Sequence, residues 1–125
     1  MINGTFRVQM YTKQYEQLCR FYEDILQLPV LLSRETSKED RVRVYGAASG
    51  QIELIYAPDR MELPESNGLT LQMQVEDVDA YCESIKKKGY TIKRGPQDQF
   101  WGHRNAKIVD PGGTELTIYS EIEGR

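Results

Sequence analysis

Residues 101–120, WGHRNAKIVDPGGTELTIYS, predict two strands joined by a tight turn. The turn lies at residues 110–113, DPGG, whose residue types are those that tight turns favour. Apolar and polar residues alternate on both sides, as in strands that bury one face. The second strand therefore places Glu115, Thr117 and Tyr119 together on its polar face. What these three side chains face is the functional question that this stretch raises.

The segment before this hairpin, residues 68–92 (GLTLQMQVEDVDAYCESIKKKGYTI), predicts a strand followed by a helix. Apolar and polar residues alternate over 69–75, which is typical of a half-buried strand. An apolar stripe at helical spacing follows, and Gly89 stands where a helix commonly ends. The stripe consists of Val78, Tyr81, Cys82 and Ile85. Further strands are predicted at about 90–94, 104–109 and 114–120.

The first half of the chain has the same organisation. Phe6, Val8 and Met10 alternate with polar residues and predict a strand. A helical stripe follows, and Pro29 stands just past its end, as a stop signal does. The stripe consists of Tyr15, Leu18, Cys19, Tyr22, Ile25 and Leu26. Three more strands are predicted at about 29–34, 41–46 and 51–57.

The two halves superpose at a shift of 63 residues, with Gln9 on Gln72 (72 − 9 = 63) and Cys19 on Cys82. Element order, helix phase and strand parity all agree, so the chain contains an internal repeat of a βαβββ unit. We expect an α+β fold with two such modules in tandem, at about 1–57 and 68–125. Residues 58–67 are rich in Pro, Asn, Gly and charge, as a linker would be. The whole chain, 1–125, is expected to form a single domain.

The single helix of each module can cover only one face of its sheet. The polar strand residues mark the other face, which is rich in Gln, Thr and Tyr and so favours a semi-buried polar cleft. A plainly solvated face is the alternative, although Lys, Glu and Ser would then be more common. The residues on this face are Arg7, Gln9, Tyr11, Gln51, Glu53, Ile55, Thr70, Gln72, Gln74, Glu115, Thr117 and Tyr119.

Composition and charge exclude several classes of partner. The net charge of −3 argues against nucleic acid and favours neutral or cationic small ligands. The sequence contains neither a secretory leader pattern nor a run of about 20 apolar residues, so we expect a cytoplasmic protein without membrane contact. Cys19 and Cys82 lie on the apolar stripes and are expected to be core thiols, because free cysteines are commonly buried.

Three stretches of the sequence follow a known pattern: FYEDILQLPV (21–30), GQIELIYAP (50–58) and WGHRNAKIVDPGGTELTIY (101–119). Together they resemble the vicinal oxygen chelate superfamily, which includes glyoxalase I, bleomycin resistance proteins, fosfomycin-modifying enzymes and extradiol dioxygenases. Gln27 stands where these proteins usually have Gly, and Thr114 where they usually have Asn. The resemblance implies mixed, curved sheets around a central cleft, one helix per module on the outer face, and a homodimer.

Enzymes of that superfamily bind a divalent metal through four residues on the first and last strands of the modules. The matching positions here hold Arg7, Glu53, Thr70 and Thr117, with Glu115 on the same face as Thr117 if the register slips by two. Arginine cannot ligate a metal and threonine is a poor ligand. His103, the single histidine, lacks a matching set of ligands. We therefore expect neither a metal nor another cofactor.

The function that this pattern favours is metal-independent binding of a small organic molecule, as in the drug-sequestering, antibiotic-resistance members of the superfamily. Arg7 and Glu53 are expected to be charged anchors that form a direct ion pair. Hydrogen bonds would come from Gln9, Thr70, Gln72, Glu115 and Thr117. The aromatic walls would be Tyr11, Tyr45, Phe100, Trp101 and Tyr119, although Phe100 and Trp101 also suit a dimer contact or a plug at the cleft edge.

Two alternatives stay open. The first is a glyoxalase-like lyase or isomerase, with Glu53 as general base and Arg7 stabilising an oxyanion. The second is a non-catalytic domain that regulates a partner protein.

Overall fold

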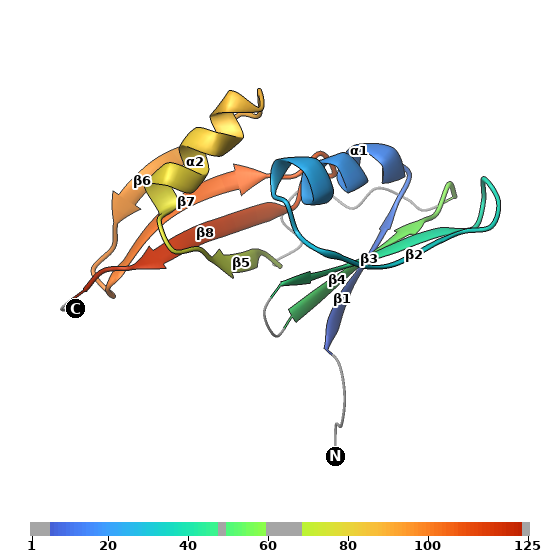
Figure 1. The fold of residues 1–125 in the computed structure, drawn as a ribbon, viewed down its shortest axis with the longest axis horizontal. Helices are drawn as coiled ribbons and strands as arrows, with labels where there is room; N and C mark the ends of the chain where they lie inside the picture. The colour runs from blue at the N-terminus through green and yellow to red at the C-terminus, as the bar shows by residue number, and fades with distance from the viewer. Residues whose placement is uncertain (1–5, 48–49, 60–68, 124–125) are drawn as a thin grey trace, which may run out of the picture. The chain divides into compact units, whose positions relative to one another are not determined.

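The structure is a computed structural model and describes residues 6–59, apart from 48–49, and residues 69–123. The chain divides into two compact units, Met1–Leu63 and Pro64–Arg125. Each unit contains one four-stranded mixed sheet and one helical segment (Figure 1). The predicted α+β fold of two βαβββ modules is confirmed.

The first unit forms a sheet that we call sheet A, with strand order β1-β4-β3-β2. Strand β1 runs parallel to β4, and the other pairs are antiparallel. The helical segment begins as an α-helix and continues as a π-helix. The elements are β1 (Arg7–Thr12), α1 (Tyr15–Arg20), η1 (Phe21–Ile25), β2 (Val30–Glu35), β3 (Arg41–Ala47) and β4 (Gly50–Tyr56).

The second unit forms sheet B, whose strand order β5-β8-β7-β6 repeats that of sheet A. Strand β5 again pairs with the last strand of its unit in parallel, and the remaining pairs are antiparallel. The elements are β5 (Leu71–Gln74), α2 (Val78–Lys87), β6 (Arg94–Asp98), β7 (His103–Val109) and β8 (Glu115–Glu121).

The repeat extends to an ion pair that ties each helix to its sheet. In unit 1, Arg41 of β3 contacts Glu16 of α1 at 3.2 Å. In unit 2, Arg104 of β7 contacts Asp79 of α2 at 2.7 Å. These residues are equivalent at the shift found in the sequence (104 − 41 = 63 and 79 − 16 = 63). The two modules therefore share a helix-to-strand contact as well as a strand order.

Most of the apolar core lies on the helix-covered face of each sheet, although Val42 and Val44 of β3 are buried on the opposite face of sheet A. In sheet A, Ile52 and Leu54 are buried together with Leu18 and Tyr22 of the helical segment. In sheet B the buried residues are Ala106, Ile108, Leu116 and Ile118 on the strands, and Val78, Cys82 and Ile85 on α2. Cys19 and Cys82 are both buried free thiols, as predicted. Burial raises the pKa of each thiol, which keeps both protonated and unreactive at neutral pH.

The turn between β7 and β8 is built around the buried side chain of Asp110. Its carboxylate Oδ1 accepts hydrogen bonds from the backbone N–H groups of Gly112 (2.9 Å) and Thr114 (2.8 Å). Gly113 has φ +94°, a conformation that glycine adopts without steric cost. This turn sets the register of the hairpin and therefore decides which residues of β7 lie beside Glu115, Thr117 and Tyr119.

One predicted strand lies elsewhere in the structure. Residues 90–93 form no strand, and β6 begins at Arg94 and runs through Gly95 and Pro96. Proline lacks a backbone donor and is confined to edge strands or bulges. Strand β6 is the edge of sheet B, and its register with β7 shifts between Arg94 and Gln97. The edge position is what admits this proline.

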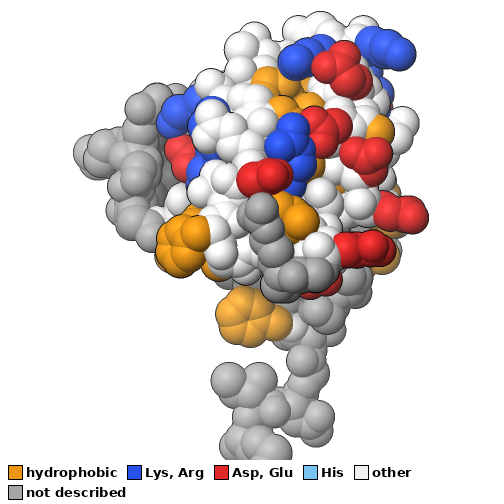
Figure 2. Space-filling model, turned by 90° about the vertical axis from the view of Figure 1, so that its left-hand side faces the viewer, with side chains coloured by type: hydrophobic (Ala, Val, Ile, Leu, Met, Phe, Trp, Pro, Cys, Tyr) orange, Lys and Arg blue, Asp and Glu red, His pale blue; other side chains and the backbone are white. Residues whose placement is uncertain are grey.

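No helix in the described part of the chain is long and apolar enough to cross a membrane. On the side of the molecule drawn in Figure 2, acidic and basic side chains are interspersed. That side therefore presents charges of mixed sign.

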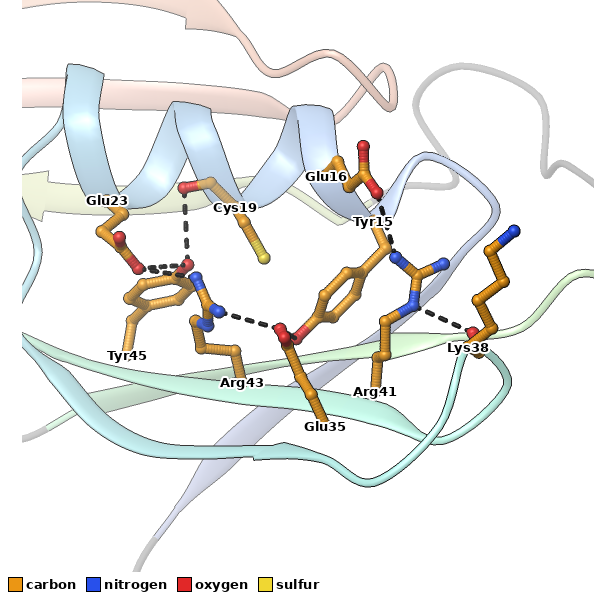
Figure 3. Close-up of polar contacts among 9 residues, drawn as sticks. All are labelled: Tyr15, Glu16, Cys19, Glu23, Glu35, Lys38, Arg41, Arg43 and Tyr45. Carbon is orange, nitrogen blue, oxygen red and sulfur yellow. Dashed lines mark hydrogen bonds and ion pairs between the residues drawn. The ribbon is translucent and has the colours of Figure 1, made fainter.

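The helix-covered face of sheet A also holds a polar network (Figure 3). The guanidinium of Arg43 contacts the carboxylates of Glu23 at 3.0 Å and Glu35 at 2.8 Å. The Tyr15 hydroxyl donates to Glu35 at 3.2 Å, and the Tyr45 hydroxyl lies 3.3 Å from Glu23. Burial raises the pKa of both tyrosines, so their hydroxyls remain protonated donors. The network thereby joins η1 to β2 and β3.

Replacing the shared cation should destabilise unit 1. We expect Arg43→Met to lower the free energy of unfolding by about 1 kcal/mol, because the half-buried Glu23 and the exposed Glu35 would lose their common partner. Arg34→Met is the matched control, since the Arg34–Asp40 pair is exposed, and we expect it to lower the free energy of unfolding much less. Urea denaturation followed by circular dichroism measures both. Equal losses would contradict this role for Arg43.

Candidate functional site

The face of each sheet opposite its helix, called here the open face, carries most of the side chains predicted to bind a ligand. On sheet A these include Arg7, Gln9 and Tyr11, which are exposed on β1. Their register partners on β4 are Gln51, Glu53 and Ile55. Alternation along β1 therefore predicted this face correctly.

The contacts on this face differ from the predicted ion pair between Arg7 and Glu53. The Nε of Arg7 donates to Gln51 Oε1 at 2.7 Å, and the Nε2 of Gln9 donates to Glu53 Oε1, also at 2.7 Å. The parallel register places Arg7 beside Gln51 and Gln9 beside Glu53. Arg7 and Glu53 are thus diagonal neighbours, and each has a closer partner directly across from it.

Tyr45 lies on the opposite face from the one predicted. It pairs with Ile52 on β4 and is fully buried beneath the helical segment (Figure 3). Its hydroxyl lies within hydrogen-bond distance of the backbone oxygen of Cys19 and of the Glu23 carboxylate. The prediction was wrong because it relied on the aromatic character of Tyr45. Side chains alternate between the two faces along β3, so Tyr45 lies on the same face as Arg43, two residues earlier. Tyr45 is a core residue.

On sheet B, the open face gathers charged groups around Glu115. The Nζ of Lys93 contacts Glu115 Oε2 at 2.8 Å, and the Nζ of Lys107 lies 3.6 Å from Oε1. Lys107 also donates to the hydroxyl oxygen of Thr117 at 2.6 Å. The hydrogen bond from Lys93, with the charge of Lys107, lowers the pKa of Glu115 and keeps it ionised at neutral pH. Glu115 and Thr117 therefore share a face, as predicted, but with lysines as their partners.

The neighbouring row of this face is aromatic. Tyr119 stacks on His103 with ring centroids 4.0 Å apart and an angle of 16° between the ring planes. The Tyr119 hydroxyl donates a hydrogen bond to Gln74 Oε1 at 3.3 Å. His103 Nδ1 is buried and has no hydrogen-bond partner among the described residues, so stacking is what holds the ring. His103 thus belongs to this face.

Asn105 occupies the same row, opposite Tyr119. Its Oδ1 accepts hydrogen bonds from Arg94 at 2.5 Å and from Gln99 at 3.1 Å, and its side chain is buried. Asn105, Lys107 and His103 were missed as open-face residues. Their positions at every second residue of β7 were visible in the sequence, but only the register set by the turn shows which residues of β8 they accompany.

The remaining predicted residues lie at the edges of this face. Phe100 and Trp101 precede β7 and are 92% and 52% exposed, with their rings in a T-shaped contact at 5.0 Å. Trp101 also lies 6.4 Å from the His103 ring. Gln72 is exposed on β5 opposite Thr117, whereas Thr70 is exposed just before that strand begins. Exposure leaves both large aromatic rings accessible to a ligand.

The residues at the four positions that hold metal in related enzymes do not fit a divalent cation. Arg7 is itself a cation, and Thr70 lies outside the strand. The oxygen of Thr117 accepts from the ammonium group of Lys107, which places a positive charge where a metal would need a donor. Among the described residues, no three His, Cys, Asp or Glu side chains gather closely enough to hold an ion. We therefore assign no chemical step to a metal.

Comparison with solved structures shows the same fold. The chain is similar to a superfamily member from Sphaerobacter thermophilus (18% identity, 96% and 98% of the two chains covered, TM-score 0.74). It is also similar to TnmS3, an antibiotic binding protein from a Streptomyces species (21%, 96% and 97%, TM-score 0.75), and to a glyoxalase/bleomycin resistance protein/dioxygenase from Nocardioides (17%, 100% and 87%, TM-score 0.70).

In sequence, no curated protein is significantly similar to the chain. The family model described as Glyoxalase/Bleomycin resistance protein/Dioxygenase superfamily matches residues 5–118, which span nearly all of the predicted elements. The first two motifs noted in the sequence lie inside this match, and it covers all but the last residue of the third. The chain belongs to the glyoxalase/bleomycin resistance protein/dioxygenase superfamily.

Proposed function

We propose that this protein binds a small organic molecule on the open faces of its sheets without the help of a metal. One observation carries this proposal: the open face of sheet B places hydrogen-bonding groups beside accessible aromatic rings. Lys107, which also donates to the buried Thr117 hydroxyl, supplies a polar group, while the rings of His103 and Tyr119 stack on one another. Binding sites combine a few placed polar groups with apolar or aromatic walls in this way.

The exposed aromatic residues support the same proposal. Phe100 and Trp101 expose large rings beside this face, and exposed apolar groups of that size commonly mark a binding surface. The name of one structural neighbour, an antibiotic binding protein, is consistent with such a role. Membership of the superfamily also supports a small molecule as the ligand. The central cleft and the cytoplasmic location expected from the sequence stay predictions.

The contacts of Glu53 and Arg7 give no specific support to a lyase or isomerase. A general base needs a carboxylate oxygen that faces the substrate, and one Glu53 oxygen already accepts from Gln9. Arg7, the expected oxyanion group, donates to Gln51. We therefore keep ligand binding as the proposed function.

A co-purified ligand is the direct test of this proposal. We expect mass spectrometry of a denatured extract to reveal a small molecule bound by the natively purified protein. Because Trp101 is the only tryptophan, adding this molecule back to ligand-free protein should quench or shift the fluorescence, and the unfolded protein is the control. A verified ligand that left the emission unchanged would remove Trp101 from the site. Absence of any bound molecule, together with no emission change across an aromatic compound library, would contradict the proposal.

Metal independence is tested separately. In calorimetric titrations with zinc, nickel and manganese, we expect no stoichiometric binding at micromolar protein, because Arg7 occupies one of the four positions and the ammonium group of Lys107 donates to Thr117 at another. A known zinc-binding protein serves as the positive control. Micromolar or tighter binding of one ion per chain would contradict metal independence and would favour the enzymatic alternative.

We also propose that the protein forms a homodimer. Strand β2 is an edge of sheet A, and its residues Val30, Leu31 and Leu32 are 45%, 53% and 46% exposed. Exposed apolar edge strands are surfaces that proteins usually cover. Light scattering should give twice the 14.5 kDa chain mass at micromolar concentrations, and Leu32→Lys should shift the equilibrium toward monomer. A single-chain mass for the unmodified protein would contradict the dimer.

A further inference from the structure

The charge around the open face of sheet B is opposite in sign to that of the whole chain. The net charge of −3 predicts a neutral or cationic ligand. On this face, however, Lys93 and Lys107 both contact one carboxylate, Glu115, and Arg94 adds a third cation opposite Lys107 on β6. The next carboxylate, Glu121, lies opposite His103, beyond the aromatic row. At the range of a bound ligand, the local charges outweigh the distant ones, because salt screens interactions beyond roughly 10 Å.

Lys107 is placed to hold an anionic group. An ammonium group has three donors, and Lys107 uses one of them on Thr117 at 2.6 Å. It faces Glu115 at 3.6 Å, which is an ion-pair distance rather than a hydrogen bond. Its side chain is 31% exposed, so solvent or a ligand can reach it. Lys107 therefore retains donor capacity on the open face.

An aromatic surface lies one row away. Lys107 and Asn105 are two residues apart on β7, as Thr117 and Tyr119 are on β8, which separates the two rows by about 7 Å. Tyr119 belongs to the second row, and the ring of His103, from the next register position, stacks on it. One end of this face can thus hold an anion while the other holds a flat ring.

We propose that this face binds an aromatic carboxylate, with its ring against Trp101, His103 and Tyr119 and its carboxylate on Lys107. The inference rests on the proposed small-molecule function and adds the chemical class of the ligand. Glu115 then opposes binding, because its negative charge lies beside the group that receives the carboxylate. In this arrangement Glu115 orients Lys93 and Lys107 and does not contact the ligand.

Three probes that differ only in head group test the charge preference: naphthoate, naphthamide and naphthylmethylammonium. Calorimetry on the full-length protein should show naphthoate binding about tenfold tighter than naphthamide, as expected for one charge-assisted hydrogen bond, and the ammonium compound binding most weakly. Raising the salt concentration should weaken naphthoate binding and leave naphthamide binding unchanged.

Substitutions at Lys107 and at Glu115 should change the affinity for naphthoate in opposite directions. Lys107→Met should weaken naphthoate binding about tenfold and leave naphthamide binding nearly unchanged, whereas Lys107→Arg should retain the preference. Glu115→Gln should tighten naphthoate binding roughly threefold by removing the opposing charge. Lys86→Met on α2, which covers the other face, is the matched control and should change nothing. If Lys107→Met fails to fold by circular dichroism, the gain in Glu115→Gln decides the question.

Equal affinity for the three probes, or a preference for the ammonium compound, would overturn this inference while leaving small-molecule binding intact. Failure of all three probes to bind would also overturn it. The proposed function would then be judged by the co-purification experiment alone, so the two failures are distinguishable.

Discussion

Each unit of this protein covers only one face of a four-stranded sheet with a helix, and the rest of the structure depends on this constraint. Successive strand residues point to opposite faces, so one helix divides every strand into a helix-facing set and an open-face set. The helix-facing set supplies apolar core residues, as Leu116 and Ile118 do on β8. The open-face set, which includes the buried Thr117 and the partly exposed Tyr119, makes polar and aromatic contacts and so becomes the candidate site.

The two modules satisfy this constraint with different chemistry. Beneath the helical segment of sheet A lie Arg43 and Tyr45, joined to carboxylates in a network. The equivalent positions beneath α2 hold Ala106 and Ile108, which are buried in an apolar core (106 − 43 = 63; 108 − 45 = 63). Buried polar groups need partners, so unit 1 depends on a specific set of hydrogen bonds where unit 2 depends on packing.

Sequence alternation predicted the open face of β8 but not the partners on that face. Glu115, Thr117 and Tyr119 share a side because strand residues alternate, and this holds for any register. Lys107 and His103 accompany them only because the turn at Asp110 pairs β7 with β8 in one register. A shift of one residue would have turned both side chains toward the helix. The open-face residues of β8 could therefore be predicted from the sequence, whereas those of β7 could be assigned only once its pairing with β8 was known.

The sequence by itself determined the element order, the internal repeat and the superfamily motifs, because each of these is encoded by local periodicity and turn residues. The tertiary structure alone decided that Arg7 contacts Gln51 instead of Glu53, and that Tyr45 is buried beneath the helical segment. The physical reason is that alternation specifies the relative faces within one strand. Which residues meet across strands is decided by backbone hydrogen bonds between segments far apart in the chain.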